Sequence, residues 1–281
     1  MKITFVPVIY DCNDNCISCP VPRKKNKKNP EFEDIKKEID YVLTYSKHIE
    51  INGGEPTLRK DLLKILGYIE RKNPSEIGLL TNAQTFYYEK FAKEIAKIKN
   101  LKIITTLYGH NSTTHDAITR TPGSFKHKIA GIKHLLKNNL SIELRILLHR
   151  LNYKHFKDIV HFITNNFNKK DFNKIIVMNA KLTERAKENK KVVAEKLTNI
   201  AKNMEKPIKQ LIKNGYYTEI YHFPHCILPK NLQQYSKGIT ADNKEVVFSK
   251  NCNPCLKRKE CSKIWKSYLY IFGSNEFKAI K

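Results

Sequence analysis

Seven cysteines fall into two groups, and the stretch of over 200 residues between the groups contains none. The first group lies near the N-terminus and the second near the C-terminus: Cys12, Cys16 and Cys19, then Cys226, Cys252, Cys255 and Cys261. Their neighbours are mostly Asp, Asn, Pro and Lys, whereas structural cysteines usually lie in apolar segments. We therefore interpret the seven side chains as ligands of metal sites.

The N-terminal group has the spacing C-x3-C-x2-C and follows an apolar run directly. A zinc site usually has four N or S ligands with paired C-x2-C knuckles, so zinc here would need a distant fourth ligand. Three thiolates on one loop can instead hold three irons of a [4Fe–4S] cluster. The fourth iron then keeps an open position, at which a small chelating molecule can bind.

A second motif follows the apolar run at 49–52, namely Gly53-Gly54-Glu55-Pro56. Two glycines let the backbone approach a ligand closely, a carboxylate can hold a positive ammonium group, and Pro56 fixes the turn. Alone, this motif would indicate a surface turn. Together with the cysteine loop it resembles the radical S-adenosylmethionine (radical SAM) enzymes, in which a C-x3-C-x2-C loop follows the first barrel strand and a GGEP motif the second.

The resemblance covers roughly residues 3–180 and implies further contacts to the cofactor. Asn82 ends the third strand, and Thr106 is the hydroxyl residue of the fourth strand that faces the cofactor. In the fifth strand, Arg145 is our candidate for the cofactor's carboxylate or ribose, because a guanidinium binds a carboxylate in a bidentate manner. The alternative is an ion pair between Arg145 and Glu143 inside the barrel.

Strand-like and helix-like patterns alternate along the first part of the chain. Strands are expected at 3–10, 48–52, 76–81, 101–108, 141–148 and 173–179, and helices at 31–46, 58–72, 85–98, 124–138 and 153–167. This alternation predicts an α/β fold with a parallel sheet and crossover helices. The resemblance implies a partial (β/α)6 TIM-like barrel, whose active residues would lie at the C-terminal ends of the strands.

The pattern changes near residue 182. We expect a radical SAM core over 1–182, followed over 183–281 by a helical stretch at 183–213, a strand at 216–223 and a small cysteine-rich extension. The helical stretch would be kinked or split at Pro207.

The four C-terminal cysteines have the spacing C-x25-C-x2-C-x5-C and can complete a second site, either zinc or [4Fe–4S]. The resemblance favours an auxiliary iron–sulfur cluster, because many members of this branch carry one in a C-terminal (SPASM or twitch-like) extension. Zinc stays open as the alternative. His225, beside Cys226, could replace one cysteine or donate a hydrogen bond to a ligand.

The resemblance implies an oxidoreductase reaction. The N-terminal cluster passes an electron from a ferredoxin or flavodoxin-like donor to SAM, and the resulting 5′-deoxyadenosyl radical abstracts a hydrogen atom from the substrate. A peptide or protein maturase is the first hypothesis, because auxiliary-cluster tails are common among peptide-modifying members. RNA modification and small-molecule cofactor biosynthesis are alternatives. A non-catalytic scaffold with two structural zinc sites is a further hypothesis of a different class.

Composition sets wider limits. The chain has 281 residues, 41% of them hydrophobic, which excludes wholesale disorder. It contains no apolar run of about 20 residues and no evident signal peptide, so we expect a cytoplasmic protein that is not inserted in a membrane. The net charge of +25 is compatible with an RNA partner. Only 8 of the 52 basic residues are Arg, however, and such a Lys bias is typical of an AT-rich genome.

Overall fold

The computed structural model of the chain describes residues 4–21, 28–240 and 243–281. Residue 3, where we expected the first strand to begin, lies outside these ranges. Eight strands form one sheet in sequential order, and every neighbouring pair is parallel. They are β1 (Phe5–Ile9), β2 (His48–Gly53), β3 (Glu76–Leu80), β4 (Leu101–Leu107), β5 (Ser141–Leu148), β6 (Lys174–Asn179), β7 (Thr218–Tyr221) and β8 (Ser236–Gly238).

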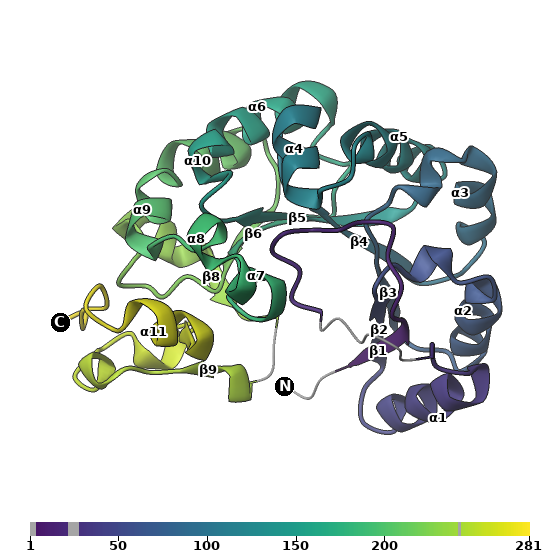
Figure 1. Cartoon of the computed structure of the whole chain (residues 1–281), viewed down its shortest axis with the longest axis horizontal. Coiled ribbons are helices and arrows are strands. Elements are labelled where there is room, and N and C mark those ends of the chain that lie inside the picture. Colours follow the sequence, from purple (N-terminus) through teal and green to yellow (C-terminus); the bar gives the residue numbers. More distant parts are fainter. Residues whose placement is uncertain (1–3, 22–27, 241–242) are drawn as a thin grey trace.

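The strands follow an open arc, with helices around its outer side and the loop after β1 on its inner side (Figure 1). The α-helices between the strands are α1 (Phe32–Leu43), α2 (Leu62–Arg71), α3 (Glu89–Ile95), α4 (Ser112–Thr119), α5 (Ser124–Lys137), α6 (Phe156–Asn166), α7 (Glu184–Glu188), α8 (Lys190–Val193), α9 (Leu197–Lys202) and α10 (Glu205–Lys213). Short 3-10 helices are η1 (Pro56–Leu58), η2 (Thr85–Tyr87), η3 (Tyr153–His155), η4 (Lys230–Tyr235), η5 (Asn243–Glu245), η6 (Lys250–Cys252) and η7 (Arg258–Glu260). The predicted α/β fold with a partial barrel is confirmed.

The sheet continues beyond the six strands that we expected. The strand predicted at 216–223 is β7, and it pairs with β6 instead of belonging to a separate extension. The eighth strand has the sequence Ser-Lys-Gly, which carries no apolar run, so periodicity could not reveal it. The sheet thus continues for two more strands beyond residue 182, where we expected the core to end.

Helical structure between residues 183 and 213 is divided among α7, α8, α9 and α10. The chain is extended at Ala194 and Lys196, which separates α8 from α9. We expected a kink or a split at Pro207, and the structure has a split just before it: α9 ends at Lys202 and α10 begins at Glu205, with this proline in the first turn of α10. A backbone N–H has no helical partner in that turn, so a proline is accommodated there without breaking the helix.

The C-terminal tail forms a small unit on the β8 side of the arc. It contains the antiparallel pair β9 (Val246–Val247) and β10 (Ile264–Trp265), followed by α11 (Lys266–Phe272). The Trp265 ring stacks on His222, with 4.1 Å between ring centroids. The buried Tyr268 hydroxyl accepts a hydrogen bond of 2.9 Å from the Leu197 N–H. These contacts attach the tail to the barrel.

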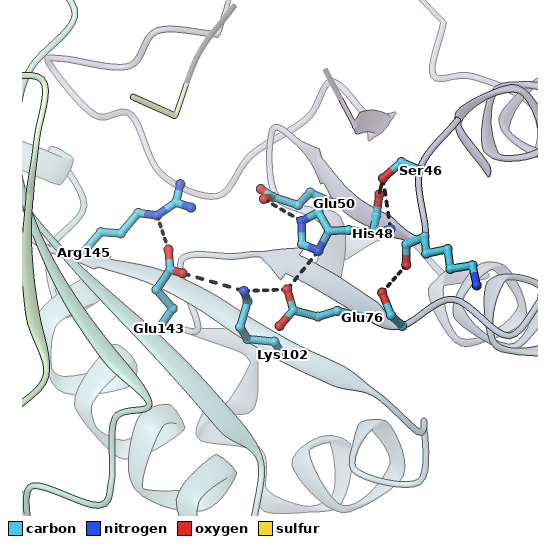
Figure 2. Close-up of polar contacts among 9 residues, drawn as sticks. Ser46, His48, Glu50, Glu76, Lys102, Glu143 and Arg145 are labelled. Atoms are coloured by element: carbon cyan, nitrogen blue, oxygen red, sulfur yellow. Dashed lines mark hydrogen bonds and ion pairs between the residues drawn. The ribbon is translucent and has the colours of Figure 1, made fainter. Parts of the chain in front are cut away.

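Side chains alternate between the two faces of the sheet, as the strand geometry requires. The outward positions pack against the helices and are fully buried; they include Ile49, Ile51, Ile77, Leu79 and Ile103. Charged residues occupy inward positions at the start of β2 to β5, where six of them interact (Figure 2). We call this group the charged belt: His48, Glu50, Glu76, Lys102, Glu143 and Arg145.

The charged belt is a chain of alternating charges. His48 lies 3.0 Å from Glu50 and 2.9 Å from Glu76. Lys102 is 2.6 Å from Glu76 and 3.7 Å from Glu143. The inner face of this barrel therefore differs from the layers of branched apolar side chains that fill a closed TIM barrel.

The belt predicts a pH-dependent contribution to stability. Hydrogen bonds that the protonated His48 ring donates to Glu50 and Glu76 raise the pKa of His48 from its ordinary 6.5 to about 9. The folded protein then binds this proton more tightly than the unfolded chain does, so the contribution is fully present below about pH 6.5 and is lost as the pH rises through about 9. We expect His48→Gln to lower the free energy of unfolding more at pH 6 than at pH 9.5, as measured by urea unfolding. An equal loss at both pH values would contradict this assignment.

Among the described residues, every helix is too short or too polar to span a bilayer.

Candidate active site

The cysteine loop and the GGEP turn are joined by backbone hydrogen bonds. β1 and β2 are parallel neighbours, so the segments that follow them leave the same edge of the sheet. The Gly54 N–H donates to the Ile9 carbonyl at 2.8 Å, and the Glu55 N–H donates to the Asp11 carbonyl at 2.7 Å. The two motifs that the sequence singled out therefore form one structural unit.

The close approach of these segments requires glycine at position 54. A Cβ atom there would lie 2.0 Å from the Asp11 carbonyl oxygen, which is far inside van der Waals contact. We expect Gly54→Ala to displace the cysteine loop and to destabilise the fold by about 1–3 kcal/mol, as overpacking does. Gly67→Ala is the matched control, because Gly67 is helical and a Cβ there would meet only Arg71 at 3.7 Å.

The control substitution should stabilise the protein by about 0.4–1 kcal/mol, since it restricts the unfolded chain without a clash. Thermal unfolding of both variants measures the difference. If Gly54→Ala were as stable as the wild type, the loop would not be held against the turn in this manner.

The Glu55 carboxylate connects the GGEP turn to the end of β3. The side chain is 1% exposed. Its Oε1 accepts hydrogen bonds from the Thr57 N–H (3.0 Å), the Thr57 hydroxyl (2.6 Å) and the Thr81 hydroxyl (2.7 Å). Its Oε2 accepts one from the Asn82 N–H at 2.6 Å. Burial raises the pKa of Glu55, and these four donors oppose the increase.

Side chains from the end of β3 in turn hold the cysteine loop. The Asn82 amide donates to Asn13 Oδ1 at 2.7 Å, and the Gln84 amide donates to Asp14 Oδ1 at 2.8 Å. Asn82 was predicted to contact the cofactor; in the structure its amide contacts the side chain of Asn13, which lies between the first two cysteines. Gln84 was missed, because nothing in the sequence singled it out.

The other side of the loop is held by the end of α4 and by α7. The Asn15 N–H donates to the Thr119 carbonyl and the Ile17 N–H to the Ile118 carbonyl, each at 2.9 Å. The buried Arg185 guanidinium donates to the Asn15 carbonyl at 2.6 Å. The loop is thus held from both sides by other parts of the chain.

The three N-terminal thiols share one environment. Burial raises the pKa of Cys12 to about 12 and also raises that of Cys16. The charge of Cys19 contributes to both increases, and the charge of Cys12 contributes to the increase at Cys16. The Asp14 N–H donates to the Cys12 sulfur at 3.3 Å, as backbone amides do toward metal-bound thiolates. Three closely placed thiols with an amide donor fit the ligand set of a cluster that has one open iron.

Thr106 and Arg145 are neighbours in register on β4 and β5, and both are half-buried on the inner face. The Arg145 Nε donates to Glu143 at 2.8 Å, so the ion pair that we gave as the alternative is present. The two terminal nitrogens of Arg145 point away from Glu143 (Figure 2).

The four C-terminal cysteines line one small pocket. Cys226, Cys252, Cys255 and Cys261 share it with His225 and residues of the tail. Backbone amides donate hydrogen bonds to three of the sulfurs. Lys278 donates to Cys226, His225 and Lys263 donate to Cys261, and Ile280 donates to Cys255 at 3.4 Å. Both ring nitrogens of His225 are buried without a hydrogen-bond partner in the described part of the chain. This donor set fits four thiolates around a metal centre.

The seven cysteines, all within the described residues, form no disulfide. Two buried charges near the N-terminal group were missed by sequence reasoning, namely Arg185 on α7 and Lys128 on α5. For Lys128 a signal existed: Ser124, Lys128, Gly131, Ile132 and Leu135 form the buried stripe of α5, so this lysine occupies a position that normally carries an apolar side chain.

Comparison with known proteins agrees with this geometry. The family model of the Radical SAM superfamily matches residues 6–163. A Methanocaldococcus jannaschii protein named "Probable GTP 3′,8-cyclase" is 27% identical over 163 residues, which are 56% of this chain and 53% of the relative. "AdoMet-dependent heme synthase" of Methanosarcina barkeri is 27% identical over 144 residues, which are 50% of this chain and 41% of the relative. The chain thus spans about half the length of these relatives.

A similar fold is found in Streptococcus suis SuiB bound to its precursor peptide SuiA. The TM-score is 0.62 with 17% sequence identity, over 78% of this chain and 48% of SuiB. At this identity the similarity concerns the fold.

Proposed function

Because the chain belongs to the radical SAM superfamily, we propose that it is an enzyme that cleaves SAM reductively and abstracts a hydrogen atom from its substrate. One observation carries this proposal. The cysteine loop, the GGEP turn and the end of β3 form a single hydrogen-bonded unit through Asp11, Glu55 and Asn82. A structural zinc knuckle would need no such connection to two neighbouring strands.

The residues divide the work as follows. Cys12, Cys16 and Cys19 would hold a [4Fe–4S] cluster, which would supply the electron for reductive cleavage of SAM. The backbone at Gly53 and Gly54 would receive the amino group of SAM. The bond-breaking chemistry itself is that of the cofactor, and the protein contributes orientation and exclusion of water.

On the inner face, Thr106 would face the cofactor, and the terminal nitrogens of Arg145 would bind the carboxylate or the ribose of SAM. Glu143 fixes the Arg145 Nε and leaves these two nitrogens directed into the barrel. A guanidinium held in this manner loses less conformational freedom when it binds a carboxylate. Asn82 acts by holding the cysteine loop as well as by facing the cofactor.

We propose a second [4Fe–4S] cluster at the four tail cysteines, with zinc as the alternative occupant. Four thiolates leave no open iron, so this centre would transfer electrons or shape the substrate pocket. A ferredoxin or flavodoxin-like protein would supply the electrons, and the net charge of +25 favours association with such acidic partners.

For the substrate we propose a peptide or protein side chain. The cysteine-rich tail and the fold shared with the peptide-bound SuiB structure support this class. A small molecule is the second candidate, because the curated relatives at 27% identity are named as a GTP cyclase and a heme synthase.

Anaerobic expression tests the activity. We expect about eight irons per chain if both centres are [4Fe–4S] clusters, or about four irons and one zinc if the tail holds zinc. With dithionite and SAM, 5′-deoxyadenosine should form. Zinc at both centres and no 5′-deoxyadenosine would select the non-catalytic scaffold.

Deuterium transfer tests the substrate class. The enzyme is incubated separately with deuterated cellular peptides, deuterated GTP and deuterated tRNA, and the 5′-deoxyadenosine is analysed by mass spectrometry. Deuterium arriving only from the peptides supports a peptide substrate. Deuterium arriving from GTP or tRNA replaces that proposal with the corresponding substrate class.

A further inference from the structure

Lys128 is a fully buried lysine behind the active site. It is 1% exposed and lies on α5, between that helix and the outer face of β4. Its Nζ donates to the Asn82 carbonyl at 2.5 Å and to the Thr105 hydroxyl at 3.1 Å. A lysine is almost never fully buried unless an acidic or dipolar partner compensates for the lost water.

The helix is placed for this contact by a glycine one turn later. A Cβ at Gly131 would lie 2.1 Å from the Ala83 carbonyl oxygen. The helix α5 therefore approaches the segment after β3 so closely that only glycine fits at position 131. The approach brings the Lys128 ammonium under the backbone of Asn82, whose N–H on the opposite side binds Glu55. The lysine is thus joined to the GGEP unit through one residue.

The charges around Lys128 are negative or become negative when the cluster binds. Asp14, Glu55, Cys16 and Cys12 all stabilise its charged form, and Lys128 in turn lowers the pKa of Cys16. Burial lowers the pKa of Lys128 to about 8, so the ammonium is still its main form at pH 7. These four groups come from the cysteine loop and the GGEP turn, which are the elements that face the cofactor.

We propose that Lys128 is the buried cation that compensates the charge of the N-terminal cluster and raises its reduction potential. Reduction adds one electron from the donor to the cluster, and a fixed positive charge nearby stabilises the reduced form relative to the oxidised form. Net charge in the surroundings is among the factors that set cluster potentials. Lys128 is therefore a positioning and charge-compensating residue, and it does not touch the substrate. This inference rests on the proposed cluster at Cys12, Cys16 and Cys19.

The test is an EPR-monitored redox titration of the anaerobically prepared full-length enzyme. The signal that changes when SAM is added identifies the N-terminal cluster, because only that cluster has an open iron. Lys128→Gln removes the charge and keeps a donor for the Asn82 carbonyl. We expect it to shift the midpoint potential of this cluster to a more negative value. Lys128→Arg retains the charge, and Lys126→Met changes an exposed lysine of the same helix, so both should leave the potential at the wild-type value.

The outcomes separate this inference from the proposed function. A wild-type protein without a SAM-responsive signal contradicts the proposed function. If the wild type shows the SAM-responsive signal and Lys128→Gln has the same midpoint potential, the role of Lys128 is contradicted and the proposed function is not. Lys128→Gln and a second neutral variant, Lys128→Met, could both lose iron. In that case, a Lys128→Arg protein that keeps its iron and the wild-type midpoint potential supports a requirement for the charge. Loss in Lys128→Arg as well shows that packing, not charge, is what the site needs, and overturns the inference.

Discussion

Cys16→Ala is expected to abolish the formation of 5′-deoxyadenosine from SAM. Cys16 is the central one of the three proposed cluster ligands, and the loop around it is held by Asn15 and Ile17 on the backbone of α4. Removing the thiol leaves this loop in place but takes away one iron ligand. Loss of a residue that only hydrogen-bonds to a metal ligand costs about 10–100-fold in affinity or activity. Loss of a ligand itself should therefore lower the rate of SAM cleavage by more than about 100-fold. The readout is 5′-deoxyadenosine by liquid chromatography, with iron counted in the same sample.

Cys255→Ala is the matched control, because it changes one cysteine of the tail. It should lower the metal content at the C-terminal centre and leave reductive cleavage of SAM measurable. Cleavage that survives in Cys16→Ala at the wild-type rate would show that the N-terminal loop does not hold the reactive cluster. Equal loss in both variants would indicate that the two centres act as one.

The meeting of the cysteine loop with the GGEP turn could be predicted from the sequence, because it depends only on topology. Both motifs directly follow apolar runs, and runs that alternate with helices pair in parallel. The carboxyl ends of β1, β2 and β3 must then lie at one edge. The structure has these strands adjacent and in order.

The polar contacts inside the site could not be predicted in the same way. Asn82 was expected at the cofactor because of its place at the end of β3, but its partner Asn13 lies 69 residues away in the chain. Lys128 is 46 residues from Asn82. Such pairs depend on how closely a helix approaches the sheet, and a hydrophobic pattern specifies which face is buried but not which polar atoms meet.

Arg145 illustrates the same limit. The resemblance singled it out in the fifth strand, and in the structure it lies on the inner face of β5, in register with Thr106 on β4. A long cationic side chain on that face can reach either a bound carboxylate or Glu143 two residues earlier on the same strand, and the sequence cannot choose between them. In the structure Glu143 takes one nitrogen of the guanidinium, so the two uses are compatible.

Glu55→Gln is expected to damage the site more than its small change in size suggests. The carboxylate is an acceptor at both oxygens, and all four of its partners are donors. An amide keeps one acceptor and replaces the other with a donor. If the amide oxygen serves Thr57 and Thr81, the amide NH2 faces the Asn82 N–H, and neither group is satisfied. A buried donor without a partner costs about 1–3 kcal/mol, so the free energy of unfolding should fall by at least that amount.

The same substitution should weaken SAM binding, because the Asn82 backbone has to move away from the amide. Asn82 holds the cysteine loop through Asn13, so the displacement passes to the cluster ligands. We expect more than a tenfold loss in SAM affinity, measured by equilibrium dialysis, together with the loss in urea stability. Glu33→Gln is the control, since its side chain is 69% exposed and its ion pair with Lys36 lies at the surface; it should change stability by less than about 0.5 kcal/mol. A stable Glu55→Gln protein with normal SAM affinity would mean that Glu55 is protonated in the folded state, because a carboxylic acid already presents a donor at one oxygen and the amide would merely reproduce it.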